Sequence, residues 1–445
     1  MKEVAAIEAD YVVVGAGAMG MASVDEVLPP SDATVAIIDR HAKPGGHWND
    51  AYPFVRLHQP SYFYGVSSTD LGSDQIDEGG LNAGLSELAS GAEVCAYFDQ
   101  VMQRRFLPSG RVSYPPRTSY ADGAATELAS GTTRTVTARR AVVDASYMAV
   151  TVPSVRQPDY EVDDGVRLVP PNGRVDVERL SGGYVVIGAG KTAFDAIIWL
   201  LGNGVEPAGI RWVVPRDSWL INREMTQPGD RFKIGEQTAM VADASSSEEV
   251  FAALEASGQF FRLDGDRDPE MYRCATVTEP EVAEMRRIDQ LIRLGRVRRL
   301  TPSGMELDGG VVDTPEPVVY VDCTADGLER RPVVDVFDGD RITLQTVRPC
   351  QQVFSAALIG FVETLDLDDA AKNELATVIP HPDTPRDFLT GSLAHIHNMG
   401  RWSQHPDLGP WMAETRLSPG TAGEGGLDLE TAIQAVMKLE SFTAS

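Results

Sequence analysis

The sequence has few cysteines and histidines, and their spacing argues against several kinds of site. The four cysteines are Cys95, Cys274, Cys323 and Cys350. They lie far apart and form no CxxC pair, which argues against a disulfide scaffold, a zinc ribbon and a dithiol redox centre. The seven histidines contain no HExxH motif. His395 and His397 form an HxH pair without a nearby cluster of acidic or cysteine ligands, so we expect no metal site.

The chain is also short of basic residues and of long apolar segments. It contains 65 acidic and 39 basic residues, for a net charge of −26, which disfavours binding to nucleic acid or to anionic membranes. No apolar run is long enough to span a bilayer. The N-terminal residues MKEVAAIEAD carry acids where a secretory signal has bases, so we expect a cytoplasmic protein.

Two segments of the chain share a strand–glycine turn–helix–strand pattern. In the first, an apolar run at residues 11–14 precedes GAGAMG at residues 15–20, and the next expected strand, residues 35–38, ends at Asp39. In the second, residues 184–187 precede GAGKTA at residues 188–193, and the next strand ends near Arg216. Each pattern is typical of a dinucleotide-binding βαβ unit.

The residue types within each turn fit phosphate binding. Gly15 allows a tight turn, Gly17 lets a pyrophosphate approach the backbone, and Gly20 lets the helix pack closely on the strand. Gly188 and Gly190 repeat the first two positions. We expect each helix N-terminus to bind phosphate groups.

The residues that end the second strand of each pattern differ in charge. A carboxylate such as Asp39 accepts hydrogen bonds from ribose hydroxyls. A guanidinium such as Arg216, with Arg223 close behind it, suits the 2′-phosphate of NADPH. Lys191 and Thr192 begin the second helix and are expected to donate to the nicotinamide pyrophosphate. We therefore predict FAD in the first unit and NADPH in the second, because one cofactor would then pass hydride to the other.

The length of 445 residues and the 43% content of hydrophobic residues indicate a globular chain of two linked domains. We predict an α/β fold with two Rossmann-like domains, in which the NADP domain is inserted into a split FAD domain. The expected boundaries are 1–160 for the first part of the FAD domain, 175–311 for the NAD(P) domain, and 312–445 for the second FAD part. This last part is expected to include a loop-rich substrate wall.

The stretch AIIDRHAKPGGHWNDAYPFVRLHQPS at residues 36–61 resembles the class B flavoprotein monooxygenases, which include flavin-containing monooxygenases and Baeyer–Villiger enzymes. The GGxW turn of that superfamily is similar to Gly45, Gly46 and Trp48, and its YP element to Tyr52-Pro53. Further similar segments are the helix expected at 93–106, GAGKTAFDA, VVPRDSWLINRE and DCTADG. The resemblance implies the cofactor-binding set Gly15, Gly17, Ala18, Gly20, Asp39, Arg40, Gly46, His47, Trp48, Gly188, Gly190, Lys191, Thr192 and Arg216.

The resemblance also implies a mechanism in which NADPH reduces FAD and the reduced flavin adds O₂ at C4a. The resulting hydroperoxide, protected from water in a closed pocket, oxygenates a small organic substrate. This sequence lacks the FxGxxxHxxxW fingerprint of the superfamily between its two domains, and His58 stands where Baeyer–Villiger enzymes have an aspartate. Both departures favour oxygenation at nitrogen or sulfur over ketone insertion.

The resemblance places residues 57–64 beside the flavin ring, and our catalytic candidates lie there. His58 is a candidate proton shuttle if it titrates near neutrality, and Gln59 is a candidate to hold the peroxide or the ribityl chain. Structural roles remain open for both. In the C-terminal third, residues 393–411 concentrate His and Trp and are expected either to form a substrate wall or to pack on the flavin domain.

Two alternatives to a monooxygenase remain open at this point. One is a flavin-dependent NAD(P)H oxidoreductase that passes hydride to an acceptor other than O₂. The other is a binding protein built on the FAD fold but without enzymatic activity, for which the altered sequence Asp144-Ala145-Ser146-Tyr147 at the first domain crossing leaves room. The expected partners are a small substrate and O₂, with a homo-oligomer as a further possibility.

Overall fold

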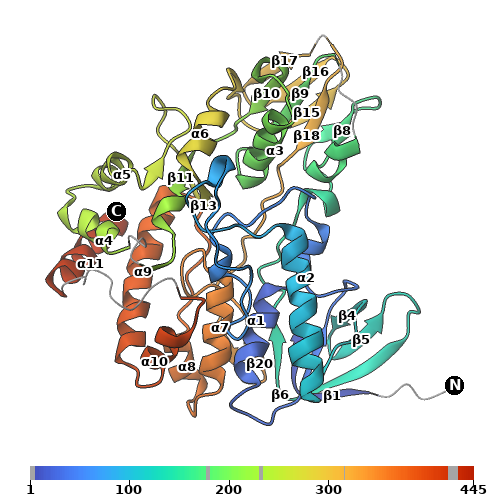
Figure 1. The fold of residues 1–445 in the computed structure, drawn as a ribbon, viewed down its shortest axis with the longest axis vertical. Helices are drawn as coiled ribbons and strands as arrows, with labels where there is room; N and C mark the ends of the chain where they lie inside the picture. Colours follow the sequence, from blue (N-terminus) through green and yellow to red (C-terminus); the bar gives the residue numbers. More distant parts are fainter. Residues whose placement is uncertain (1–5, 177–180, 230–233, 315, 419–428, 445) are drawn as a thin grey trace.

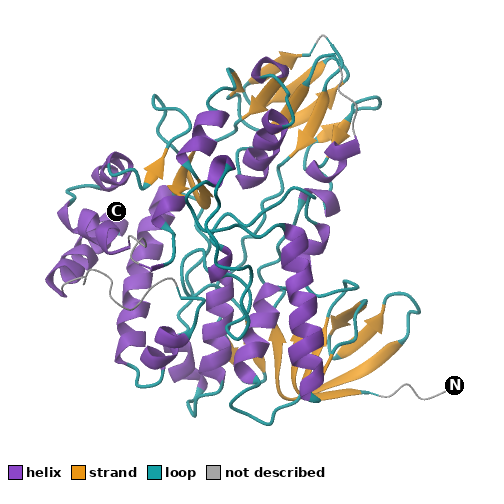
Figure 2. Ribbon diagram, in the orientation of Figure 1, coloured by secondary structure: helices purple, strands orange, loops and turns teal. Residues whose placement is uncertain are grey.

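Parallel sheets and helices alternate along the chain. The computed structural model describes residues 6–176, 181–229, 234–314, 316–418 and 429–444. In these ranges the strands form four sheets, and the predicted mixed α/β class is confirmed. Figure 1 shows one sheet with its helices at the bottom and another at the top, and Figure 2 shows that the space between them is occupied mostly by loops.

The lower sheet contains the first predicted βαβ unit. Its strand order is β19-β20-β6-β1-β2-β3, and β1 (Ile7–Val14) runs parallel to both β2 (Val35–Ile38) and β6 (Thr133–Asp144). All four residues of β2 are buried, as expected for an apolar strand covered on both faces. The remaining strands are β3 (Val112–Ser113), β4 (Thr118–Ala121), β5 (Ala124–Glu127), β19 (Phe337–Asp338) and β20 (Arg341–Thr343).

Helices α1 (Ala18–Val27) and α7 (Gln352–Glu363) pack together beside this sheet, although more than 300 residues separate them. Helix α2 (Gly91–Val101) begins at a capping box, in which the Ser90 side chain accepts from the Glu93 N–H and the Glu93 side chain accepts from the Ser90 N–H. A wider helical turn, Met102–Phe106, continues it. The helix predicted at 93–106 is therefore present.

The upper sheet contains the second predicted unit and is entirely parallel. Its order is β14-β10-β9-β18-β8, with β9 (Tyr184–Ile187) between β10 (Ile210–Val213) and β18 (Val319–Asp322). Helix α3 (Lys191–Gly202) follows β9 directly. The outer strands are β8 (Leu168–Val169) and β14 (Gln290–Ile292).

Two smaller sheets flank the upper one. One has the order β12-β11-β13 and the other β17-β16-β15-β7. Their bounds are β7 (Glu161–Val162), β11 (Ser218–Asn222), β12 (Phe260–Phe261), β13 (Met271–Val277), β15 (Val297–Thr301), β16 (Gly304–Leu307) and β17 (Gly310–Asp313). The remaining helices are α4 (Ile234–Asp243), α5 (Ser247–Ala256), α6 (Glu279–Met285), α8 (Asp369–Leu375), α9 (Pro385–Gln404), α10 (Leu408–Glu414) and α11 (Leu429–Thr443).

The structure differs from the sequence-based boundaries at one junction. We placed residues from 312 onward with the first unit, but β18 pairs with β9 in the upper sheet. The chain returns to the lower sheet only at β19. The residues of a short apolar strand do not indicate which sheet it joins. The sequence pattern therefore did not predict that β18 belongs to the upper sheet.

The C-terminal segment also differs from its prediction as a loop-rich wall. Residues 385–404 form one long helix, α9, which starts at a capping box between Thr384 and Asp387, and α10 follows it. Trp402 and Trp411 are buried against Phe354 of α7. Their aromatic rings therefore serve the core.

Within the described residues, no helix combines the length and the apolar character that a bilayer crossing requires.

The close packing of α1 on α7 generates a stability prediction. A Cβ atom added at Gly360 would lie 2.6 Å from the carbonyl oxygen of Ser23 in α1, so Gly360→Ala forces the two helices apart. We expect this change to lower the free energy of unfolding by about 1–3 kcal/mol. Urea unfolding followed by circular dichroism measures it.

The matched control is Gly400→Ala in α9, where a Cβ would meet no atom within 4 Å. We expect a neutral or stabilising effect of up to about 1 kcal/mol, since alanine favours the helix. Equal losses of stability in both variants would contradict the packing explanation.

Candidate functional site

The second glycine turn forms an open cradle at the start of α3. Gly188 has φ +125°, and a Cβ there would lie 2.6 Å from the Cys323 carbonyl oxygen, so glycine is required. Gly190 is the N-cap of α3 and offers no side-chain cap, and a Cβ on it would meet no atom within 4 Å. The first amides of α3 therefore lie beside open space, which fits an anionic group.

The first glycine turn is more tightly enclosed. A Cβ on Gly20 would lie 2.1 Å from the Gly15 carbonyl oxygen, so the helix does pack closely on the strand as expected. The Gly45 N–H donates to the Ala16 carbonyl oxygen at 2.9 Å. A Cβ on Gly46 would lie 2.9 Å from Cα of Gly17. The GGxW segment thus lies directly against the first turn, and α1 likewise begins without a side-chain cap.

Asp39 holds the first turn in place. Its carboxylate is buried and accepts the Ala16 N–H at 2.6 Å, the His41 N–H at 2.6 Å and the His41 Nδ1 at 2.9 Å. The Nε2 atom of His41 lies 2.8 Å from Asp50 Oδ2. The hydrogen bond between His41 Nδ1 and Asp39 raises the pKa of His41. A carboxylate has about four lone-pair sites, so ribose binding by Asp39 would use the remaining one.

A cavity of about 810 Å³ lies between the two units. The second glycine turn, from Gly188 to Thr192, lines one part of it. His58 and Gln59 line another part, and residues 348–352, which lead into α7, line a third. The predicted nicotinamide turn and the predicted flavin-side residues therefore open onto the same space.

A direct contact joins the GGxW region to α3. The Tyr52 hydroxyl donates to Asp195 Oδ2 at 2.6 Å, and Asp195 also pairs with Lys191 one turn earlier in the helix. Burial, with Asp195 nearby, raises the pKa of Tyr52 well above its usual value, so the phenol stays protonated. The YP element of the resemblance thus connects the two units.

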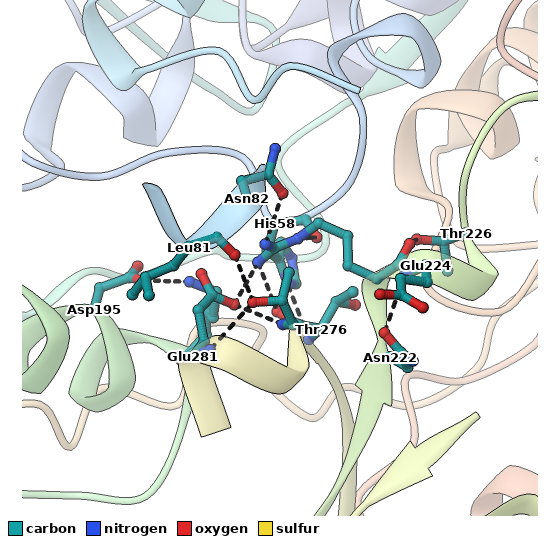
Figure 3. A network of polar contacts seen from close by, with 12 residues as sticks. His58, Leu81, Asn82, Asp195, Asn222, Glu224, Thr226, Thr276 and Glu281 are labelled. Atoms are coloured by element: carbon teal, nitrogen blue, oxygen red, sulfur yellow. Dashed lines mark hydrogen bonds and ion pairs between the residues drawn. The ribbon is translucent and has the colours of Figure 1, made fainter. Parts of the chain in front are cut away.

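A buried arginine makes the second connection. Arg223 is fully buried and donates from Nε to the His58 carbonyl oxygen at 3.1 Å and from Nη1 to Asn82 Oδ1 at 3.0 Å. Its Nη2 donates to Glu281 Oε2 at 2.9 Å and to the Thr276 carbonyl oxygen at 3.3 Å. Figure 3 shows His58, Asn82, Thr276 and Glu281 around this network. Arg223 is therefore unavailable for the 2′-phosphate contact suggested by its position in the sequence.

His58 does not fit the expected proton shuttle. Burial lowers the pKa of its imidazole to about 3, so the ring is neutral at neutral pH. Its Nδ1 accepts the Thr276 N–H at 3.4 Å. Gln59 lines the cavity and accepts from Gln351 Nε2 at 3.2 Å, which fixes its amide beside α7.

The aromatic part of the GGxW segment anchors its own loop. Trp48 Nε1 donates to the Tyr64 hydroxyl at 2.7 Å. Burial lowers the pKa of the neighbouring His47 to about 4, so its ring is neutral. Arg40 is exposed after β2, and Ala18 occupies the first position of α1. These placements are compatible with backbone contacts to a cofactor, and they show what holds the segment without one.

Arg216 lies in a charged cluster at the cavity edge. Its guanidinium donates twice to Asp383, at 2.8 and 3.1 Å, and these bonds keep the pKa of Asp383 below its usual range. Arg330 also pairs with Asp383, and Arg273 Nε lies 3.6 Å from it. Arg273 also pairs with Asp326 at 3.0 Å, so three guanidinium groups share two carboxylates and leave one positive charge over. The sequence pattern missed Arg273 and Arg330 because they come from distant segments.

The N-terminal part of α9 forms part of the cavity wall. The α9 residues that line the cavity are Asp387, Phe388, Gly391, Ser392, His395, Ile396 and Met399. Burial lowers the pKa of His395 to about 3, which keeps it neutral. The tryptophans of this segment lie in the core, as described above.

The cysteines differ from the sequence-based expectation. Cys274 of β13 and Cys350, just before α7, form a disulfide with a Cα–Cα distance of 6.3 Å. Cys95 and Cys323 take no part in a disulfide. The pairing joins segments 76 residues apart in sequence, and no local spacing motif marks it.

The fold and the site together define an α/β protein with two glycine turns at helix N-termini, the second of which lines the cavity between the units. The chain is 47% identical over 420 residues to the uncharacterized proteins Rv2000 and MT2056 of Mycobacterium tuberculosis and Mb2023 of Mycobacterium bovis. The matches cover 93% of this chain and 78% of each relative. The chain therefore belongs to the family of these mycobacterial proteins. No protein-family model matches the sequence.

The solved structures to which this chain is similar at low identity include two flavoprotein monooxygenases. A flavin-containing monooxygenase from Stenotrophomonas maltophilia is 17% identical, with a TM-score of 0.43 over 76% of this chain and 90% of that chain. The open form of cyclohexanone monooxygenase is 13% identical, with a TM-score of 0.49 over 98% of both chains.

The buried Arg223 generates a prediction for the connection between the units. Arg223→Met leaves Glu281 buried without its cation, so we expect a loss of about 3–5 kcal/mol in the free energy of unfolding. Urea unfolding measures the loss. Arg287→Met is the control, because Arg287 is half-exposed and pairs with Glu284 on the surface of α6. We expect that change to cost less than about 1 kcal/mol; a similar cost for both would refute a special role of Arg223.

Proposed function

We propose that this protein is an FAD- and NADPH-dependent monooxygenase that oxygenates a small organic substrate. One observation supports this proposal most strongly. The second glycine turn, at the uncapped start of α3, lines the same cavity as His58 and Gln59, which the motif resemblance places beside a flavin. The neutral His58 and the missing interdomain fingerprint favour oxygenation at nitrogen or sulfur. The two domains of the proposal correspond to the units built on the lower and upper sheets.

The residues around the first turn fit FAD. The backbones of Gly17 and Gly46 lie directly against one another at the start of α1, since neither residue has a side chain. The helix start lacks a side-chain cap, so its amides are available to a pyrophosphate. Asp39 orders the turn and keeps one lone-pair site for a ribose hydroxyl. Trp48, fixed by Tyr64, would hold the segment that covers the dinucleotide.

The residues around the second turn fit NADPH. Gly190 leaves open space in front of α3, and Lys191 and Thr192 line it. The pairing of Lys191 with Asp195 holds this side chain near the start of the helix. Arg216, with Arg273 and Arg330, supplies the positive charge that a 2′-phosphate requires.

When bound, FAD and NADPH supply hydride transfer and the activation of O₂. The residues of the chain position the two cofactor sites relative to one another. Tyr52 and Arg223 hold the two units at a fixed separation, and Gln59 presents a positioned amide to the cavity. His58, His381 and His395 line the cavity as neutral rings. Few mobile protons are therefore available inside it, which suits a reaction that water and stray protons would spoil.

The proposal is tested by measuring FAD content and NADPH-dependent O₂ consumption with a panel of amines, sulfides and ketones. We expect about one FAD per chain, and oxygenated product from an amine or a sulfide in proportion to the NADPH consumed. Peroxide release without product from any substrate would favour an oxidoreductase of another kind. A protein that cannot be loaded with FAD would refute the proposal.

Arg216 yields a prediction on coenzyme choice. Arg216→Ala removes a charged donor, and losing a hydrogen bond to a charged group costs about 1.5–3 kcal/mol. We expect the KM for NADPH to rise about tenfold to about a hundredfold, and the KM for NADH to change much less. Steady-state kinetics with both coenzymes measures this. Arg299→Ala is the control, because Arg299 pairs with Asp163 outside the cavity lining. Equal effects on both coenzymes would remove Arg216 from the 2′-phosphate site.

A further inference from the structure

The disulfide lies in the wall of the cavity and joins two separate parts of the fold. Cys274 belongs to β13 of a small sheet beside the upper unit, and Cys350 immediately precedes α7 of the lower unit. Both cysteines line the cavity. Cys95 and Cys323 take no part in a disulfide, so this cross-link is the single disulfide among the four cysteines.

Both cysteines adopt a backbone conformation that is rare for residues with a side chain. Cys274 has φ +56° and Cys350 has φ +59°. Such left-handed conformations cost about 1 kcal/mol or more per residue and occur mainly where a function maintains them. Strained disulfides are the more labile ones, so strained backbone at both ends fits a cross-link that exchanges.

The two cysteine residues differ in exposure. Cys274 is 5% exposed, whereas Cys350 is partly exposed. Exchange with a thiol requires an approach to one sulfur from solvent. Cys350 is therefore the sulfur that an incoming thiolate attacks, and Cys274 is the leaving group.

His381 faces this pair. One imidazole nitrogen and the two sulfurs all lie within 4.8 Å of one another. Its Nδ1 is buried and has no hydrogen-bond partner within the residues that the structure describes. Burial, with Arg273 nearby, lowers the pKa of His381 to about 4, so the ring is neutral and has an acceptor lone pair. It can accept a hydrogen bond from a thiol released at this position.

We propose that Cys274 and Cys350 form a redox-active disulfide that exchanges with low-molecular-weight thiols entering through the cavity. A thiolate attacks the Cys350 sulfur, the bond between the two cysteines breaks, and Cys274 leaves as a thiolate that takes up a proton. A second thiol then attacks the mixed disulfide and releases Cys350. Two thiols are oxidised to one disulfide, and the pair gains two electrons and two protons. This site goes beyond the proposed oxygenation and requires neither FAD nor NADPH.

The charge of the cavity favours an anionic thiol. Although the chain carries a net charge of −26, the described residues that line the cavity include six basic and three acidic side chains. Positive charge stabilises both an approaching thiolate and any carboxylates it carries. Glutathione is the anionic probe, and cysteamine is the matched cationic probe. We expect glutathione to react at least about tenfold faster than cysteamine once the rates are corrected for thiolate content.

The experiment counts thiols in the native full chain. The protein is incubated in graded glutathione buffers, quenched with acid, unfolded and alkylated, and each cysteine is quantified by peptide mass spectrometry. Without reductant we expect only Cys95 and Cys323 to be alkylated. With increasing glutathione we expect Cys274 and Cys350 to become alkylated together, while circular dichroism shows a folded protein.

Two variants identify the attacked sulfur. In Cys274→Ser, oxidised glutathione should give a stable mixed disulfide on Cys350. The control Cys95→Ser removes a thiol outside the cavity lining and should titrate like the unchanged protein. If Cys274→Ser does not fold, the glutathione titration of the unchanged protein alone tests whether the disulfide exchanges in the folded state.

Several results would overturn the proposal. Alkylation of both cysteines before any reduction would show that no bond forms. Reduction only after unfolding would make the disulfide purely structural. One zinc ion per chain, with both cysteines released by a chelator alone, would make the sulfurs metal ligands instead. Equal rates with glutathione and cysteamine would contradict the anionic class of thiol.

Discussion

The buried charge of Arg223 constrains how the two units of this molecule are arranged. Arg223 is fully buried and keeps its charge, because a guanidinium does not deprotonate in proteins. All of the partners that satisfy it must therefore be in place at once: Glu281, Asn82 and two backbone carbonyl oxygens. One of these oxygens belongs to His58 beside the cavity. The cost of an unpaired buried cation thus fixes the cavity segment against the upper unit.

This constraint holds His58 and Gln59 of the lower unit at the cavity that the second glycine turn lines. Tyr52, through Asp195, adds a second connection from the GGxW segment to the helix of the second turn. The two turns are otherwise unlike: the first is closed over by Gly46, and the second opens on the cavity at Gly190. A closed cradle suits a resident cofactor that rarely leaves, and an open one suits a coenzyme that comes and goes.

Local sequence predicted the elements well and their partners poorly. The strand at 184–187 and its helix follow from an apolar run and a glycine turn, both of which act within a few residues. The strand at 319–322 was placed with the wrong sheet because pairing depends on distant residues. The helix α9 was read as loops because its apolar residues alternate with histidine, asparagine and glycine. Thr384, Pro385 and Asp387 are a local helix-start pattern that our prediction overlooked, whereas the packing against α7 depends on distant residues.

The same distinction holds for the site. The glycine positions and Arg216 follow from motif spacing, and the structure brings the second turn and Arg216 to the cavity. The neutral state of His58 depends on burial by other segments, and the disulfide depends on contacts between distant ones. Long-range packing sets both, and a single sequence does not encode it in any local pattern.

The central claim is that a coenzyme in the second turn reduces a flavin in the first across the shared cavity. The most direct test is anaerobic addition of NADPH to the FAD-loaded protein, followed at the flavin absorbance. The account predicts bleaching by one NADPH per FAD, and loss of rapid bleaching in Gly190→Val, whose side chain fills the open cradle while FAD is retained. Flavin that stays oxidised in the unchanged protein, or bleaching that Gly190→Val leaves equally fast, would contradict it.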